Sequence, residues 1–321
     1  MTRPSAVPPP VTAVLDASSR WLPARLGEVE DRLRGAIAGH GELLSEDAAA
    51  TLAAGGKRLR PMLVLLCAGE KGGEGAVRAA TAIELVHMAT LVHDDVLDEA
   101  PLRRGLPTVA ATSGRERAIS TGDLLLSRAF ALLAEAGEDR SVQLLADAAV
   151  ALARGELAQR HDAFDLGISE QRYLLRCRLK TATLFECACL LGHDDPHLRE
   201  FGAEVGLAFQ LLDDVLDVSG PPERTGKARG TDLLDGTVTL PLIEAAAADP
   251  GIRDVDLHGL DTASAAQLCD RIAATGALEK VRGRALGMVA AGKRQLEGAG
   301  FEPEQRKLLA LVADGVVQRY S

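Results

Sequence analysis

The chain has 321 residues, with 36 Lys and Arg against 46 Asp and Glu, and a net charge of −10. Such an acidic balance argues against general nucleic-acid binding. The longest apolar runs, such as 62–68, are far too short to span a bilayer, so the sequence favours a soluble cytoplasmic protein.

The Pro-rich segment 1–10 lacks the apolar core of a signal peptide, and we expect it to be a disordered tail. Ala, Leu, Glu and Arg dominate the remainder, only 3% of the residues are aromatic, and alternating strand-like runs are hard to find. The sequence therefore predicts one all-α domain over 11–321, a large helical bundle with a central cavity.

Helical periodicity predicts a first helix over 11–38 and a second that begins near Ser45 and ends at the Gly55-Gly56 turn. A long helix over 77–98 follows, and Pro101 forces a turn after it. Further helices are predicted over 116–136, 140–163, 169–191 and 196–218, with about three more after residue 231. The segment 219–231 is rich in Gly, Pro and cations, and we expect a mobile loop there.

The pentapeptide Asp-Asp-Val-Leu-Asp occurs twice, at 94–98 and 213–217, each time near the end of an apolar helical pattern. Its first and last carboxylates are four residues apart and share one helix face. Two carboxylates about 4 Å apart repel by roughly 4 kcal/mol at an effective dielectric near 20, and hard cations relieve this repulsion. We expect Mg²⁺, because proteins commonly hold it with one or two carboxylates plus substrate phosphates.

Two clusters of cations have the composition of a phosphate site. Gly55 and Gly56 precede Lys57, Arg58 and Arg60, so that backbone access and positive charge coincide. A second pair, Arg103 and Arg104, follows the first acidic motif. Taken alone, each cluster is equally compatible with a solvated basic turn.

Three other polar positions stand near the acidic motifs. His87 is two helical turns before Asp94, and Gln210 is one turn before Asp213. The pair Lys180-Thr181 interrupts an apolar helix with a cation that is able to point inward. From the residues alone, each of them is also compatible with a structural or surface role.

Seven segments, taken in order, resemble the signature of trans-polyprenyl diphosphate synthases, the head-to-tail isoprenyl chain-elongation enzymes. They are GGKRLRP at 55–61, HMATLVHDDVLD at 87–98, RRG at 103–105, GD at 122–123, KT at 180–181, FQLLDDVLD at 209–217 and GKARGTDL at 226–233. The resemblance covers nearly the whole chain. It implies an isoprenoid-synthase bundle that forms a homodimer and uses Mg²⁺.

The resemblance also implies roles for individual residues. Isopentenyl diphosphate is expected to be held by Lys57, Arg60, His87 and Arg104. The allylic diphosphate is expected to be served by Arg103, Lys180, Thr181, Gln210 and Lys227. Mg²⁺ is expected on Asp94, Asp98 and Asp213, with Asp95, Asp214 and Asp217 as further ligands or as residues that orient them. Direct parts in the reaction are expected for Asp94, Asp98, Asp213, Lys180 and Lys227.

One position departs from the pattern. Many relatives read EGKxTLP where this chain reads DGTVTLP, so Thr237 stands in place of a Lys. One phosphate contact is therefore in doubt, and Lys227 and Arg229 are candidates to replace it.

The residues upstream of the first acidic motif bear on product length. Short-chain relatives have bulky aromatics four and five residues before it, whereas this chain has Thr90 and Ala89. Small side chains would let a growing tail pass towards Val86 and Ile83, which favours a long-chain product. Geranylgeranyl diphosphate stays open as the alternative.

Two other functions use similar residues. A class I terpene cyclase also has an Asp-rich motif and Mg²⁺, but it has no need of the basic segment 55–61. A non-catalytic partner subunit of a heteromeric synthase would share the fold but would be expected to lose Asp residues, and all six are present. The sequence therefore favours an active prenyltransferase.

Overall fold

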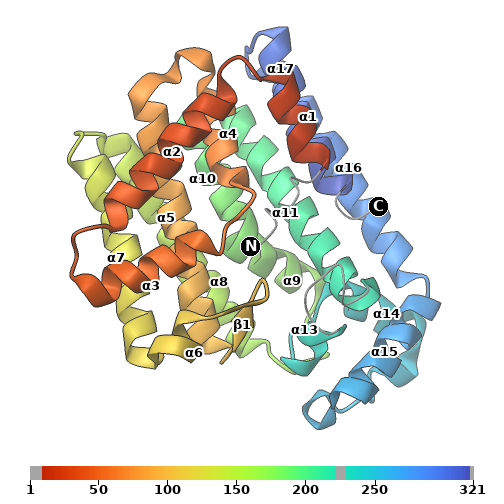
Figure 1. The fold of residues 1–321 in the computed structure, drawn as a ribbon. Helices are drawn as coiled ribbons and strands as arrows, with labels where there is room; N and C mark the ends of the chain where they lie inside the picture. Colours follow the sequence, from red (N-terminus) through yellow and green to blue (C-terminus); the bar gives the residue numbers. More distant parts are fainter. Residues whose placement is uncertain (1–8, 221–228, 319–321) are drawn as a thin grey trace.

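The computed structural model describes residues 9–220 and 229–318, which fold almost entirely as helices. The α-helices are α1 (Pro9–Ala17), α2 (Leu22–Ile37), α3 (Glu42–Ala53), α4 (Leu59–Ala68), α5 (Gly73–Leu97), α6 (Val109–Ser113), α7 (Arg115–Ala134), α8 (Asp139–His161), α9 (Glu170–Cys177), α10 (Thr183–Gly192), α11 (Pro196–Ser219), α13 (Thr231–Leu234), α14 (Leu240–Ala248), α15 (Thr262–Ala274), α16 (Ala277–Gly298) and α17 (Pro303–Gln318). The predicted all-α fold is confirmed (Figure 1).

The predicted helix over 11–38 is wrong as a single element, because the chain turns between Ala17 and Leu22. Pro23 lies in the first turn of α2, where a backbone N–H has no partner within the helix and its absence therefore costs nothing. Inside a continuous helix the same proline would remove a backbone hydrogen bond and clash with the preceding turn. Helix α1 already includes Pro9 and Pro10, so it begins within the predicted tail. It packs beside α17 at the other end of the chain (Figure 1).

Other predicted boundaries also shift. Helix α3 begins at Glu42 after Gly41, and Ser45 does not open it but accepts a hydrogen bond from the His40 N–H at 3.3 Å. Helix α5 begins four residues before the predicted Val77 and ends at Leu97. Between residues 231 and 318 the structure has five α-helices instead of about three, because the single turn α13 and the short helix α14 were not foreseen.

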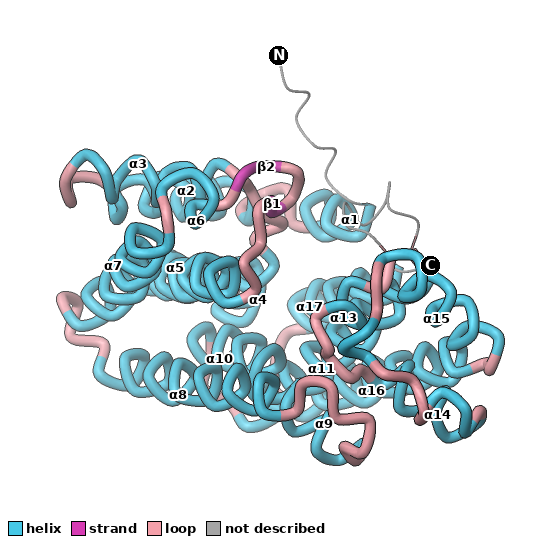
Figure 2. Tube along the Cα trace, turned by 90° about the horizontal axis from the view of Figure 1, so that it is seen from below, coloured by secondary structure: helices cyan, strands magenta, loops and turns pink. Residues whose placement is uncertain are grey.

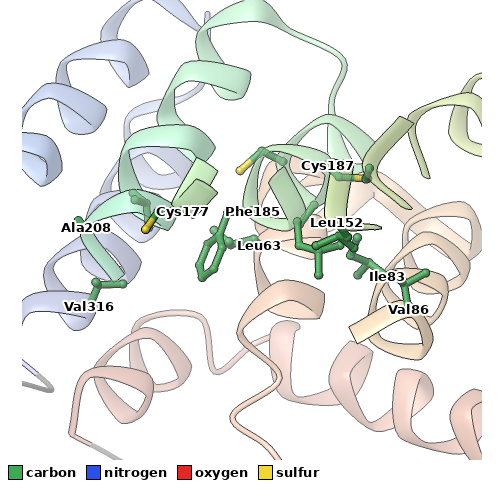
Figure 3. Close-up of a cluster of buried hydrophobic side chains, with 14 of the residues drawn as sticks. Leu63, Ile83, Val86, Leu152, Cys177, Phe185, Cys187, Ala208 and Val316 are labelled. Carbon is green, nitrogen blue, oxygen red and sulfur yellow. The ribbon is translucent and has the colours of Figure 1, made fainter. Parts of the chain in front are cut away.

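The helices lie in layers, which Figure 2 shows nearly end-on. Helices α2 and α3 cover α5 and α7, and α8, α10 and α11 lie on the opposite side. The core between these layers includes Leu63 of α4, Ile83 of α5 and Phe185 of α10, all 0% exposed (Figure 3). Burial of such side chains stabilises the bundle by about 1.5–3 kcal/mol each.

Helices α5 and α11, which carry the two acidic motifs, end on the same side of the bundle, where β1 and α13 follow them (Figure 1). After α5 the chain forms a small hairpin, β1 (Leu102–Arg103) paired with β2 (Leu106–Pro107). Its two turn residues, Arg104 and Gly105, have φ of 53° and 77°. Positive φ at both central residues is typical of a type I′ turn, whose twist matches that of the two flanking strands.

The predicted helix over 169–191 is interrupted by a π-helical turn, Arg178–Ala182, between α9 and α10. A π-turn inserts one extra residue into the helical ladder and therefore rotates the side chains around it. Lys180 and Thr181 lie in this turn. The interruption noted in the sequence thus has a structural counterpart.

One helical span of the described residues, Glu70–Leu97, is long and apolar enough to cross a membrane, with a mean hydropathy of 1.3. No uninterrupted apolar run in the sequence predicts this span, because polar and charged residues divide it. Within the structure 72% of this apolar stretch is buried against other helices. It is therefore the core helix of the bundle.

Candidate active site

The first acidic motif ends α5, and Asp94 is half-buried there. Burial is the main reason that its pKa rises to about 6. The Lys180 ammonium opposes this rise, whereas the carboxylates of Glu156 and Asp98 add to it. A carboxylate that is costly to ionise is one that a bound cation would stabilise.

Asp98 takes part in a chain of ion pairs. Its Oδ1 accepts a hydrogen bond from Arg160 Nη2 at 2.5 Å, and Arg160 Nε donates to Glu156 Oε1 at 2.9 Å. The second oxygen of Glu156 lies 2.5 Å from Lys180 Nζ. We call this series, Lys180–Glu156–Arg160–Asp98, the ion chain. It joins the π-turn, α8 and the end of α5.

Asp95 faces a different partner. Its side chain is buried, and Oδ1 accepts a hydrogen bond from Arg103 Nε at 2.7 Å. The contact ties the hairpin to the end of α5. One of the six aspartates therefore orients a cation of the predicted allylic site.

The second acidic motif ends α11, where Asp214 is buried. Its Oδ2 accepts from the Tyr173 hydroxyl at 2.5 Å, and its Oδ1 accepts from Gln210 Nε2 at 2.7 Å. Burial, followed by the charge of Asp232, raises the pKa of Asp214 to about 8, although both hydrogen bonds oppose the rise. With both oxygens engaged in this way, Asp214 serves to hold the motif in place.

Asp217 lies one turn further along α11. Its Oδ2 accepts a hydrogen bond from the Asp232 N–H at 3.2 Å, and its backbone carbonyl accepts from the Gly230 N–H at 3.0 Å. These contacts attach α13 to the end of α11. Asp232 belongs to the 226–233 segment, and its carboxylate was not singled out in the sequence.

The π-turn connects the two acidic motifs. Lys180 extends to Glu156 and influences Asp94, whereas the neighbouring Thr181 hydroxyl donates to Gln210 Oε1 at 2.6 Å. Gln210 in turn holds Asp214. Adjacent residues of one turn therefore reach both motifs, so Asp94, Lys180, Thr181, Gln210 and Asp214 belong to one site.

Gly155 explains how α8 reaches the π-turn. A Cβ at this position would lie 2.6 Å from the Lys180 backbone N and 2.9 Å from the Leu179 carbonyl carbon. Only a glycine lets the two backbones approach this closely. The approach brings Glu156 within reach of Lys180.

Arg58 anchors the basic segment that precedes α4. It adopts a left-handed backbone with φ of 47° and forms ion pairs with Glu30 and with the buried Glu84, the latter at 2.8 Å. A Cβ on Gly56 would lie 3.1 Å from the Arg58 guanidinium and 3.4 Å from that of Arg104. The left-handed backbone of Arg58 is strained for a residue with a side chain, and its ion pairs with Glu30 and Glu84 hold it in place.

Arg60 lies deeper, with its guanidinium 4.9 Å from the centre of the Phe185 ring. Burial, opposed by Glu84 and assisted by Arg104, lowers its pKa to about 10. Within the part of the chain that the structure describes, its buried Nε has no hydrogen-bond partner. A bound anion would supply one.

His87 belongs to the same cluster. Burial is the main cause that lowers its pKa well below the ordinary value, and Arg60, Arg104 and Arg103 act in the same direction. The imidazole is therefore neutral at pH 7, with one N–H available to donate. His87, Asp95, Arg103 and Arg104 line a cavity of about 380 Å³ between α3, α5 and the hairpin. The predicted isopentenyl diphosphate residues Arg60, His87 and Arg104 thus come together.

Two other predicted residues add nothing to the geometry of this cluster. Lys57 is exposed at the start of the basic segment, and Lys227 lies outside the described residues. Arg229, a candidate to replace the Lys missing at Thr237, donates to the Val218 carbonyl at 2.6 Å and pairs with Asp270 at 2.7 Å. Its charge is therefore used to hold the end of α11 against α15.

No three His, Cys, Asp or Glu side chains cluster closely enough to enclose a metal ion within 9–220 and 229–318. The donors fit an open site better: Asp94 and Asp98 on one helix and Asp213 on another, with oxygen ligands still to come from a phosphate. This is the arrangement expected for Mg²⁺.

Sequence reasoning missed Glu156, Arg160, Tyr173 and Glu84. The first two form an ordinary i, i+4 pair of opposite charge, which by itself indicates a solvated helix face. Tyr173 is fully buried in the structure. The sequence contained a signal for it, because the chain has only two tyrosines. No local pattern pointed to Glu84.

Comparison with known proteins identifies the family of the chain. Residues 42–268 match the polyprenyl synthetase family. The chain is 42% identical over 241 residues to heptaprenyl diphosphate synthase component 2 of Geobacillus stearothermophilus, an alignment that covers 72% of this chain and 75% of that protein. It is 37% identical over 273 residues to all-trans-nonaprenyl-diphosphate synthase of Rhodobacter capsulatus, covering 81% and 83%.

A solved polyprenyl synthase from Caulobacter crescentus, complexed with calcium and isoprenyl diphosphate, superposes with a TM-score of 0.88 at 30% identity, covering 99% of this chain and all of the other. Heptaprenyl diphosphate synthase from Staphylococcus aureus has the same TM-score at 28% identity and covers 94% of this chain. The likeness therefore extends over the whole bundle. The chain belongs to the polyprenyl synthetase family and is a prenyltransferase.

Proposed function

We propose that this protein is a cytoplasmic, Mg²⁺-dependent synthase that condenses isopentenyl diphosphate with an allylic diphosphate to make a polyprenyl diphosphate. The observation that carries the proposal is the π-turn, whose Lys180 and Thr181 reach the two acidic motifs at once. The basic cluster of Arg60, His87 and Arg104 lies against the same end of α5. One site therefore has places for two diphosphates.

The allylic diphosphate would lie between the acidic motifs. Asp94, Asp98 and Asp213 would hold Mg²⁺, which supplies positive charge for the departing diphosphate. Lys180 and Arg103 add fixed cations on the same side, and Asp95 orients Arg103. The C–O bond of the allylic substrate breaks with its electron pair on the leaving diphosphate.

Isopentenyl diphosphate would lie in the basic cluster. Arg60 and Arg104 bind its diphosphate oxygens, and the neutral His87 donates a hydrogen bond without adding charge. The double bond attacks the allylic carbon to form the new C–C bond. Loss of a proton, with the released diphosphate as acceptor, restores a double bond.

The acidic motifs provide the direct test. Asp94→Ala and Asp213→Ala should each lower turnover by at least about 100-fold, because positioned electrostatic groups contribute factors of this size. Circular dichroism should show an unchanged helical fold. Condensation of labelled isopentenyl diphosphate that survives excess EDTA would overturn the Mg²⁺ dependence.

We propose a long-chain product, because Ala89 and Thr90 are small and the similar proteins include heptaprenyl, octaprenyl and nonaprenyl synthases. Geranylgeranyl diphosphate is the second candidate, since a geranylgeranyl diphosphate synthase of Methanosarcina mazei is 33% identical over 283 residues. Chromatography of the dephosphorylated products from several allylic primers distinguishes the two.

We propose a homodimer that is active without another protein. The similar Geobacillus protein is named as component 2 of its synthase, so a heteromeric assembly is the alternative. Condensation by the purified chain alone supports the first arrangement. Activity that appears only after a second protein is added would support the other.

A further inference from the structure

Arg160 lies on α8 and bridges two carboxylates through different edges of its guanidinium. Nη2 donates to Asp98 at the end of α5, and Nε donates to Glu156 one turn earlier on α8. The side chain remains 43% exposed and that of Asp98 34% exposed. None of the seven signature segments includes Arg160.

The contact with Asp98 conflicts with the proposed metal site. A guanidinium on Oδ1 and a divalent cation on the same carboxylate repel each other and compete for one donor. Occupation of Asp98 by a metal therefore weakens the contact of Arg160 with this carboxylate. The guanidinium then needs another anion.

Glu156 limits the positions that the Arg160 guanidinium is able to reach. It keeps Nε of Arg160 through the i, i+4 pair, and the opposite oxygen of Glu156 is held by Lys180. The guanidinium thus stays on the Glu156 carboxylate that also holds Lys180, with Nη2 directed to the end of α5. A diphosphate bound to a metal on Asp98 would lie within reach of these Nη groups, and the fork of Arg N–H donors matches phosphate oxygens.

We propose that Arg160 is a diphosphate-binding residue of the allylic site, which competes with the metal for Asp98 and passes to the metal-bound diphosphate. The inference rests on the proposed function and adds to it. Glu156 is the positioning residue of the pair, because it holds both Arg160 and Lys180.

Two binding experiments on the purified full chain test the proposal. The first titrates Mn²⁺ alone and follows free Mn²⁺ by electron paramagnetic resonance. The second titrates inorganic pyrophosphate calorimetrically in saturating Mg²⁺. The variants are Arg160→Gln and Arg160→Lys. The control is Arg154→Gln, which removes the same charge from an exposed position of the same helix.

The two readouts should move in opposite directions. Arg160→Gln should bind Mn²⁺ about two- to fivefold more tightly, since it loses a competitor of exposed ion-pair strength. It should bind Mg²⁺-pyrophosphate about tenfold more weakly, since it loses a charged donor. Arg160→Lys should fall between it and the wild type for pyrophosphate, and Arg154→Gln should match the wild type.

Loss of both affinities together would mean that Arg160 only supports the fold, and this result overturns the proposal. Equal behaviour of Arg160→Gln and Arg154→Gln overturns it as well. In either case a wild-type chain that condenses the two diphosphates leaves the proposed function intact. A wild-type chain that binds neither probe and forms no product contradicts the proposed function itself.

Discussion

The environment of Asp214 favours the protonated form of its carboxyl group. Burial and the nearby charges of Asp232 and Asp213 raise its pKa to about 8. Between about pH 4, the usual range of the unfolded chain, and pH 8, the native protein therefore binds more protons at Asp214 than the unfolded protein does. The contribution of Asp214 to stability is thus lost as the pH rises through this window.

Asp214→Asn should remove this dependence, because the amide stays neutral and keeps an acceptor for Tyr173. The free energy of unfolding of the variant should match the wild type near pH 4 and exceed it increasingly towards pH 8, by on the order of 1 kcal/mol per pH unit. Urea unfolding in EDTA measures both. The exposed Asp254→Asn is the control, and a difference that does not change with pH would contradict the assignment.

Much of the site at this scale was predictable from the sequence. Among the residues that the family signature assigned, Lys180 pairs with Glu156, Thr181 donates to Gln210, and Gln210 donates to Asp214. The second Asp of each Asp-Asp pair is held by a side chain from another segment, and these contacts were not predictable. They depend on Tyr173 and Arg103, whose contacts join segments 41 and 8 residues away from their partners.

The π-turn is the element on which the site depends most. The sequence analysis found the polar interruption at Lys180 but predicted a continuous α-helix through it. The extra residue of a π-turn leaves no periodic signal of its own. Its register depends on the close approach of α8 at Gly155, a contact between distant segments.

Gly155→Ala tests this approach. The added methyl would meet backbone atoms of Leu179 and Lys180, which cannot rotate away, so the two helices must separate. Unfolding should become easier by about 1–3 kcal/mol, and the KM for the allylic diphosphate should rise as Lys180 loses Glu156.

Gly27→Ala in α2 is the matched control, because a Cβ there meets nothing within 4 Å. Replacing a glycine inside an open helix face should stabilise the protein, by up to about 1 kcal/mol. If Gly155→Ala behaves like Gly27→Ala in urea unfolding and in kinetics, the close packing of α8 has no role in the site.

Product length belongs to the scale of the whole bundle, because the proposed long-chain product would extend between its layers. Ala89 is 1% exposed, and Val86 and Ile83 beyond it are buried in the core (Figure 3). Ala89→Phe should shorten the prenyl products while the enzyme stays folded, if a path for the tail runs past this residue. Chromatography of the dephosphorylated alcohols measures the lengths.

Ala80→Phe provides the comparison. Ala80 is also buried, but nine residues earlier it lies on the opposite face of α5. The ring should overpack the core there and cost about 1–3 kcal/mol without changing product length. Unchanged products from a folded, active Ala89→Phe variant would show that the tail does not pass this residue and would remove the main support for a long-chain product.

The outer face of α8 predicts how two copies meet. Val150 and Leu157 are seven residues apart on this helix and are 61% and 69% exposed. Apolar side chains at this spacing form one stripe along a helix, and a stripe that faces its own copy across a two-fold axis buries itself. Leu157→Glu would place two carboxylates against each other in such a dimer.

Light scattering should therefore report a dimer for the wild type and a monomer for Leu157→Glu. Leu43→Glu on α3, which replaces a leucine that is 58% exposed, should stay dimeric. Equal masses for Leu157→Glu and the wild type would place the contact between copies on another face.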